Sequence, residues 1–165
     1  YANENWCMIG FHSVSVLADA MMKSNPGFDY FRALKAAVTT SNQRFYEGLG
    51  AYLDYQFVPE NLSGNSVSKT LEYAYDDWCI AQMAKKLGQD SLCGIYQKRA
   101  AFYKNQFDSS IGFMRPRMSD GSFKKEFDVL STHGQGFIEG NAWNYSLYVP
   151  QDPKSLMELM DSIWI

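Results

Sequence analysis

The chain has 165 residues, of which 46% are hydrophobic and 16% aromatic, and this composition can bury the core of a single domain. The formal net charge is −3 and no run of Lys or Arg occurs, which argues against a nucleic-acid-binding surface or an anchor on anionic membranes. No apolar run approaches the roughly 20 residues needed to span a bilayer, so we expect no membrane span. The three cysteines, Cys7, Cys79 and Cys93, form no C-x-x-C pair, and we expect them to be buried, inert thiols.

The first half of the chain predicts two helices and an irregular connection. Apolar side chains with few charges predict a largely buried helix over residues 6–23. An Asn-Pro-Gly turn at 25–27 follows, and Asp29 can cap a second, amphipathic helix that runs to about Tyr46. Glycines end this helix, and residues 52–65 are expected to form an aromatic connection followed by a polar loop.

Two polar residues interrupt the first predicted helix. His12 and Asp19 are seven residues apart, which places them on one helical face. They fit either a hydrogen-bonded pair of core polar groups or the lining of a pocket.

A long helix is predicted from about Ser66 to Leu87, where Gly88 stops it. Apolar residues lie around most of its circumference, so it should be buried on most sides.

One face of this long helix carries Ser68, Glu72 and Asp76 in a row four residues apart, with Asp77 adjacent. Like charges at this spacing destabilise a helix by about 0.2–0.5 kcal/mol, so a compensating group should lie nearby. The carboxylates fit pairing with Lys69 or with an arginine of a neighbouring helix, or else they face a substrate.

The second half of the chain predicts three further helical segments and a hairpin. The helices are expected over residues 90–107, from near residue 139 to about 148, and over residues 154–163. Between residues 112 and 127 the period changes, and Asp120-Gly121 suggests the turn of a short β-hairpin.

The alternation of buried and amphipathic helices predicts three αα-hairpins in a curved double layer. The expected fold class is therefore mainly α, an αα-hairpin toroid with a small β-hairpin insertion. The first, third and fifth helices would be inner, with Glu72 and Glu139 near the starts of inner helices on one rim. We expect a pocket at that rim.

Glu139 follows a glycine-rich stretch and precedes an aromatic helix. A helix dipole favours an acid in the first turn, so Glu139 fits either a stabilising N-terminal acid or the floor of a sugar site. Four aromatic residues offer flat faces for sugar rings or simply fill the core; they are Trp6, Trp78, Trp143 and Tyr145.

A toroid of αα-hairpins with acids on one rim is a common setting for glycoside hydrolysis, in which one carboxylic acid protonates the leaving oxygen. Four segments point further: Trp6-Cys-Met-Ile-Gly-Phe-His-Ser13, the helix Ser66–Gly88, Gly112-Phe-Met-Arg-Pro-Arg117 and Glu139-Gly-Asn-Ala-Trp-Asn-Tyr145. In content and order they resemble glycoside hydrolase family 92, the calcium-dependent exo-α-mannosidases.

The resemblance implies an inverting, exo-acting hydrolase that removes terminal mannose from N-glycans or mannan, with α-1,2-linked or related mannosides as substrates. It implies an (α/α)6 barrel behind an N-terminal β-sandwich, so that residues 1–165 would form about half of the barrel. It also implies Ca²⁺ as the cofactor and a secreted, periplasmic or cell-surface protein.

The resemblance implies Glu139 as the general acid. An aromatic, partly desolvated pocket would keep such an acid protonated, although a helix N-terminus acts in the opposite direction. Asn141 is the candidate calcium donor on this chain. The candidate substrate-binding residues come from the rim and the inner helices; they are Trp6, His12, Glu72, Asp76 and Trp143.

The later segments of the family, which hold the Asp pair that the resemblance implies as general base, do not occur in this sequence. We therefore expect the 165 residues to be a piece of a larger enzyme and to be inactive alone. Two alternatives stay open. Another inverting (α/α)6 hydrolase, of the glucoamylase or trehalase kind, would use the same rim, whereas a non-catalytic helical binding module would use these acids only for pairing or solubility.

Overall fold

The structure, a computed structural model, describes residues 8–161. As predicted, it is mainly helical with one small antiparallel sheet. In chain order the elements are α1 (Ser13–Met22), α2 (Tyr30–Thr40), α3 (Leu49–Tyr55), α4 (Ser66–Lys86), α5 (Asp90–Ala100), the 3₁₀-helix η1 (Phe102–Gln106), β1 (Phe107–Asp108), β2 (Phe113–Met114), α6 (Ala142–Tyr145) and α7 (Pro153–Asp161).

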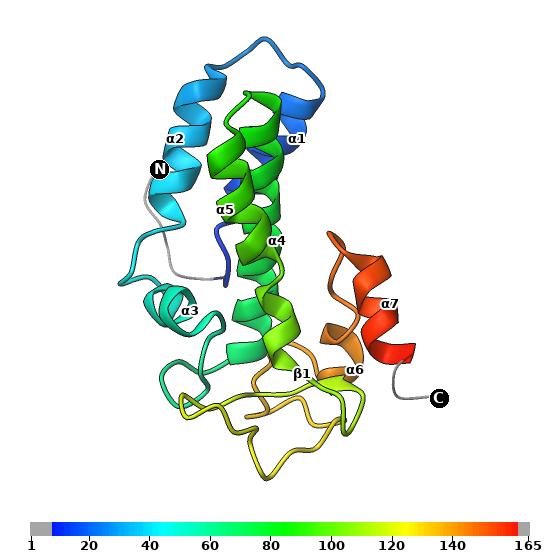
Figure 1. Ribbon diagram of the computed structural model, residues 1–165. Coiled ribbons are helices and arrows are strands. Elements are labelled where there is room, and N and C mark those ends of the chain that lie inside the picture. The colour runs from blue at the N-terminus through cyan, green and yellow to red at the C-terminus, as the bar shows by residue number, and fades with distance from the viewer. Residues whose placement is uncertain (1–7, 162–165) are drawn as a thin grey trace.

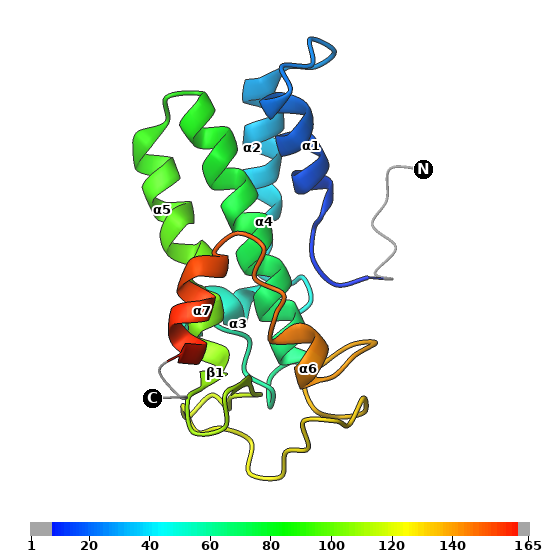
Figure 2. The ribbon, with the colours of Figure 1, turned by 90° about the vertical axis from the view of Figure 1, so that its right-hand side faces the viewer.

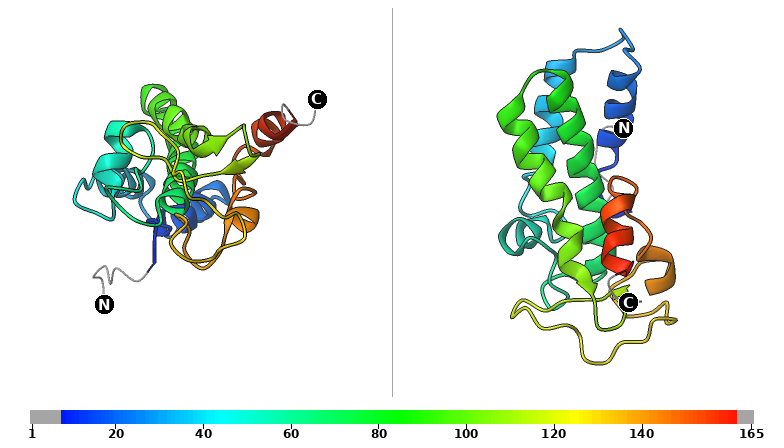
Figure 3. Two further views of the ribbon diagram at one scale, coloured as in Figure 1. Left: turned by 90° about the horizontal axis from the view of Figure 1, so that it is seen from below. Right: turned by 45° about the vertical axis from the view of Figure 1, so that its right-hand side comes forward.

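Helix α4 runs through the centre of the molecule (Figure 1). Helices α1, α2 and α5 lie along its C-terminal half, in two αα-hairpins, α1–α2 and α4–α5 (Figure 2). Figure 3 shows α6 and α7 along the lower part of α4, below α1. Two hydrophobic clusters meet on α4, one around Tyr73 and Ile80 and the other around Val67 and Leu71. Because α4 is buried from both sides, the polar residues on it are fixed by packing.

Three of the predicted helices have different ends. The helix predicted over residues 90–107 ends at Ala100, and the 3₁₀-helix η1 follows it. The first helix begins at Ser13 and not near residue 6, because Gly10 has a left-handed φ of 83° and the N–H of Phe11 bonds to a side chain of α4. The second helix ends at Thr40 and not near residue 46. There the hydroxyl of Ser41 bonds to the carbonyl of Val38 and to a tyrosine of α5.

The helix α3 forms within the segment predicted to be an aromatic connection. It has seven residues and lies between two left-handed residues, Gly48 (φ 80°) and Gln56 (φ 63°). Leu49 and Tyr52 are fully buried. Since so short a helix is marginal by itself, tertiary packing stabilises it, and its sequence is too short to show a helical period.

The third predicted αα-hairpin is reduced to two short pieces. Helix α6 is a single turn of four residues and α7 has nine. The helix predicted over residues 139–148 is shortened to α6, because Asn141 caps the chain only at Ala142 and Ser146 turns its hydroxyl to the N–H of Met114.

The β-pairing lies earlier in the chain than predicted. Strand β1 pairs with β2 in antiparallel register, and each strand has two residues. The turn at Asp120-Gly121 is formed, but a single antiparallel bridge between Arg117 and Phe123 closes it. Strands of two residues carry no alternating pattern, so the sequence could not locate the stronger pair.

Cys79 and Cys93 are buried free thiols, as predicted, and burial raises the pKa of Cys79 to about 12. Cys7 lies outside the described residues. Over residues 8–161, none of the helices combines the length and the apolar character needed to cross a bilayer.

Candidate functional site

The polar row on α4 is buried in the folded chain. Ser68 and Asp76 are fully buried, and Glu72 is 9% exposed. Buried polar groups require hydrogen-bond partners, and three different segments supply them here.

The ring of His12 joins Glu72 to Asp76, and we call these three side chains the His12 triad. His12 Nδ1 lies 2.8 Å from Asp76 Oδ1, and Nε2 lies 3.0 Å from Glu72 Oε2. The N–H of Phe11 donates to the other oxygen of Asp76 at 2.8 Å. The histidine thus compensates the two like charges on α4.

The other acids found different partners. Asp19 is exposed and pairs with a lysine one turn later, so the hydrogen-bonded pair, one of the two interpretations of His12 and Asp19, is excluded. Asp77 pairs with Arg99 of α5, the arginine from a neighbouring helix that the sequence left open. Lys69 is not the partner of these acids, because it bonds to a glutamate outside α4 at 2.7 Å.

Hydrogen bonds to Asp76 and Glu72, the first having the larger effect, raise the pKa of His12 from 6.5 to about 10. The ring is therefore protonated at neutral pH, and both nitrogens donate. Burial raises the pKa of Asp76, while the bonds from His12 and from the N–H of Phe11 oppose that rise. Burial, with the charge of Glu72 as the next cause, holds the pKa of the Tyr148 phenol far above its ordinary value, so this hydroxyl stays protonated.

The raised pKa of His12 predicts a pH-dependent contribution to stability. The contribution is fully present below the unfolded-state pKa of 6.5 and is lost as the pH rises through the folded value of about 10. The thermal unfolding midpoint of the wild-type protein should therefore exceed that of His12→Gln at about pH 6, with the difference shrinking by about pH 11. An equal difference at both pH values would contradict the protonated, bridging histidine.

The segment before Glu139 is held on the N-terminal end of α4. The carbonyl of Gly136 accepts the N–H groups of Val67 at 3.0 Å and Ser68 at 3.2 Å, and the N–H of Ile138 donates to Ser68 Oγ at 3.1 Å. Gly136 has a φ of 82°, and a Cβ there would lie 2.5 Å from a carbon of a neighbouring proline. Only glycine fits this close, left-handed approach.

Glu139 itself lies in the loop and not in a helical turn, which corrects the prediction. Its φ of 52° is a left-handed conformation that costs a non-glycine residue about 1–2 kcal/mol. Its side chain is exposed, and α6 begins only at Ala142. Glu139 is therefore not an acid of the first helical turn, and one of its two interpretations is excluded.

Asn141 caps α6 and does not fit a calcium ligand. Its Oδ1 accepts the N–H groups of Trp143 at 3.0 Å and Asn144 at 3.3 Å, and its Nδ2 donates to the carbonyl of Leu130. Both lone pairs of the amide oxygen are thus in use. Calcium takes about six to eight oxygen ligands, and among the described residues no group of three or more His, Cys, Asp or Glu is placed to hold a metal ion.

Trp143 and Tyr145 point to opposite sides of α6. Trp143 is 57% exposed and meets Phe113 edge-on, with ring centroids 5.0 Å apart, beside a cavity of about 280 Å³. Tyr145 packs against Tyr148, and burial together with the charge of Glu72 raises the pKa of its hydroxyl. The structure therefore brings Tyr145, and not Trp143, to the polar row of α4.

Tyr145 connects the His12 triad with the loop of Glu139. Burial raises the pKa of this phenol, and the charges of Glu72 and Glu139 add to the effect, so both carboxylates lie within electrostatic range of one hydroxyl. Trp6 lies outside the described residues. Sequence reasoning missed Tyr148, although its three-residue spacing from Tyr145 is the pattern of two side chains on one side of a turn.

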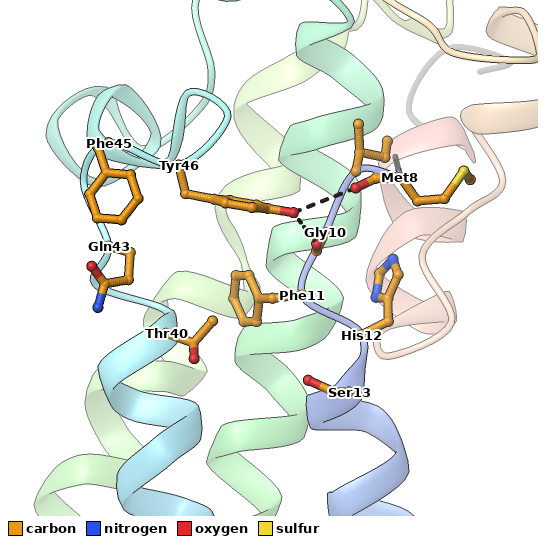
Figure 4. Close-up of a pocket in the computed structure, with 10 residues that line it drawn as sticks. Met8, Gly10, Phe11, His12, Ser13, Thr40, Gln43, Phe45 and Tyr46 are labelled. Carbon is orange, nitrogen blue, oxygen red and sulfur yellow. Dashed lines mark hydrogen bonds between the residues drawn. The ribbon is translucent and has the colours of Figure 1, made fainter. Parts of the chain in front are cut away.

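A cavity of about 470 Å³ opens beside the segment that carries His12 (Figure 4). Phe11 projects towards Tyr46, whereas the ring of His12 lies on the other side of the segment. The hydroxyl of Tyr46 donates to the carbonyl of Gly10 at 2.9 Å. This bond fixes the backbone that presents His12 to α4.

Comparison with known proteins identifies relatives of the whole segment. The model of the glycosyl hydrolase family 92 catalytic domain matches residues 1–163. The structure of a family GH92 α-mannosidase from Bacteroides thetaiotaomicron is 42% identical with a TM-score of 0.94, and the match covers 99% of this chain and 22% of that chain. A GH92 inverting mannosidase from Bacteroides thetaiotaomicron VPI-5482 is 35% identical with a TM-score of 0.91, over 97% of this chain and 22% of that chain.

A curated protein of Arthroderma benhamiae, described as an uncharacterized secreted glycosidase, is 24% identical over 189 residues. The alignment covers 92% of this chain and 24% of that protein. The chain therefore spans about a quarter of the length of the relatives that it matches.

Proposed function

Because the chain belongs to the catalytic domain of glycosyl hydrolase family 92, we propose that the complete protein is an inverting, exo-acting α-mannosidase. Its substrates would be α-1,2-linked or related mannosides of N-glycans or mannan. The other parts of its own catalytic domain and a β-sandwich domain would complete the site. A secreted, periplasmic or cell-surface location suits such glycans, and the description of the Arthroderma protein as secreted supports it.

The observation that carries this proposal is the way the chain presents Glu139. The carboxylate is exposed on a left-handed residue whose neighbours are fixed, by α4 on one side and by the cap of α6 on the other. Strained backbone held by its surroundings is typical of functional positions. The similarity to an α-mannosidase, at 42% identity over nearly the whole chain, supports the α-mannosidase activity itself.

In an inverting glycosidase, one carboxylic acid protonates the leaving oxygen. A carboxylate about 6.5–9.5 Å away activates a water molecule on the opposite face of the sugar. We assign the first role to Glu139, which gives its proton to the glycosidic oxygen as the bond to the anomeric carbon breaks. The general base would come from another segment of the catalytic domain, and it takes the proton of the attacking water.

The His12 triad is suited to binding the sugar. His12 uses one acceptor position of the Glu72 carboxylate, and its remaining lone pairs can accept a sugar hydroxyl. Asp76 is fully buried, so it acts by holding His12 and does not reach the substrate. The exposed indole of Trp143 offers a face on which a further part of the glycan can stack.

The stereochemistry of hydrolysis tests this proposal. The complete protein should cleave para-nitrophenyl α-mannoside, and proton NMR should detect β-mannose as the first-formed anomer, because inversion converts the α-linkage into a β-product. First-formed α-mannose would contradict inversion, and a preference for α-glucosides would favour an enzyme of the glucoamylase or trehalase kind. Mannoside binding without hydrolysis would favour the binding module.

A further inference from the structure

We propose that Ser68 is a positioning residue that sets the place of the Glu139 carboxyl through the backbone of Ile138. This inference rests on the proposed function of Glu139 as the general acid. Ser68 touches neither the sugar nor the reacting atoms in this account, so its role is exerted entirely through the loop.

The contact between Ser68 and the loop is direct and fully buried. Ser68 Oγ accepts the N–H of Ile138 at 3.1 Å, and Ile138 immediately precedes Glu139. Ser68 has no exposed surface, so water cannot replace this bond without a change in packing. The backbone N–H of Ser68 also donates to Gly136 at 3.2 Å. One residue of α4 therefore holds the loop at two points, both within three residues of Glu139.

The backbone conformation of Glu139 depends on the bond between Ser68 and Ile138. Its φ of 52° is one that a glutamate leaves unless its neighbours hold it. Without the bond to Ser68, the Ile138–Glu139 peptide can relax towards extended backbone, which would carry the carboxyl away from the leaving oxygen. A displacement of about 1 Å at a catalytic group is enough to lower the rate about a hundredfold.

Ser66 supplies a matched control on the same helix. It is also fully buried, and its Oγ has no hydrogen-bond partner in the structure, so Ser66→Ala removes a buried hydroxyl without touching the loop. Ser68→Ala removes the same atom from a residue two positions later. We therefore attribute any difference in activity between the two variants to the contacts of Ser68.

The test compares two substrates of the complete protein. An α-mannobiose needs a proton on its leaving oxygen. In α-mannosyl fluoride the leaving group is fluoride, which departs with little help from an acid. Ser68→Ala should lower kcat on the mannobiose by about ten- to a hundredfold, with KM nearly unchanged and hydrolysis of the fluoride nearly unchanged. Ser66→Ala should leave both reactions as they are. Ser68→Cys, which keeps a weaker hydrogen-bonding group, should give a rate on the mannobiose between those of Ser68→Ala and the wild type.

Equal losses on the two substrates would assign Ser68 a purely structural role and overturn the proposal. Wild-type rates of Ser68→Ala on the mannobiose would overturn it as well. Should Ser68→Ala fail to fold, Ser68→Cys decides alone: an equal loss on both substrates, or no loss on either, rejects positioning. Glu139→Gln tests the general acid separately from the positioning role of Ser68. A Glu139→Gln variant as active as the wild type on the mannobiose would reject Glu139 as the acid, whatever the result at Ser68.

Discussion

Glu139→Gln should lower kcat of the complete protein on an α-mannobiose by about 10²- to 10⁴-fold, the usual contribution of a general acid. Glutamine keeps the size and polarity of the side chain but has no proton to give to the leaving oxygen. Because Glu139 is exposed and lies in a loop, the substitution should not disturb the core. Steady-state kinetics with matched circular dichroism spectra measure the effect.

The same substitution at Glu126 is the control. Glu126 is also an exposed loop residue of this chain, so Glu126→Gln removes an equal charge. Its kcat should stay at the wild-type value. A Glu139→Gln enzyme with the rate of Glu126→Gln would exclude Glu139 from the chemistry.

Arg99→Met should lower the free energy of unfolding by about 3–5 kcal/mol, because it leaves the buried carboxylate of Asp77 without its charge partner. Arg99 Nε lies 2.9 Å from Asp77 Oδ2, and its terminal nitrogen lies 2.8 Å from Oδ1. The hydroxyl of Tyr52 donates to the same carboxylate at 2.9 Å. This group joins α3, α4 and α5, so its loss should loosen the helix that carries the polar row.

The pH dependence of the Arg99→Met deficit gives a second readout. Burial raises the pKa of Asp77 from 3.8 to about 7. A raised folded-state pKa means that stability falls as the pH rises from 3.8 through that value, and loss of the arginine extends the fall to higher pH. The deficit should therefore be larger at about pH 8 than at about pH 5.

Urea unfolding of wild type and variant at both pH values measures this, and Arg44→Met is the control. Arg44 pairs with Asp54 at the surface, where both side chains are more than half exposed, so its loss should cost about 0–1 kcal/mol. Equal deficits for Arg44→Met and Arg99→Met would contradict the importance of the buried pair.

The long central helix was predictable to within one residue. Ser66 begins it as expected, and it ends at Lys86 where the prediction ended it at Leu87. Twenty-one residues of helical pattern and a following glycine make such an element evident. The seven-residue α3 and the single turn α6 were not predictable, since packing and a cap residue decide elements of that length.

In the candidate site, the sequence likewise did not predict which side chains come together. The like charges of Glu72 and Asp76 predicted that a compensating group lies nearby. Its identity required the tertiary fold, because His12 is 64 residues from Asp76 in sequence. The left-handed backbone of Glu139 was equally hidden, since a glutamate rarely adopts it and only its neighbours impose it here.

The leaving-group dependence of the Glu139→Gln variant shows whether Glu139 is the general acid. A series of aryl and alkyl α-mannosides, from dinitrophenyl to methyl, demands increasing protonation of the leaving oxygen. If Glu139 supplies that proton, the ratio of wild-type to variant kcat/KM should rise steadily from near one for dinitrophenyl mannoside to about a hundred or more for the alkyl mannosides. A ratio that stays constant along the series would show that Glu139 is not the general acid.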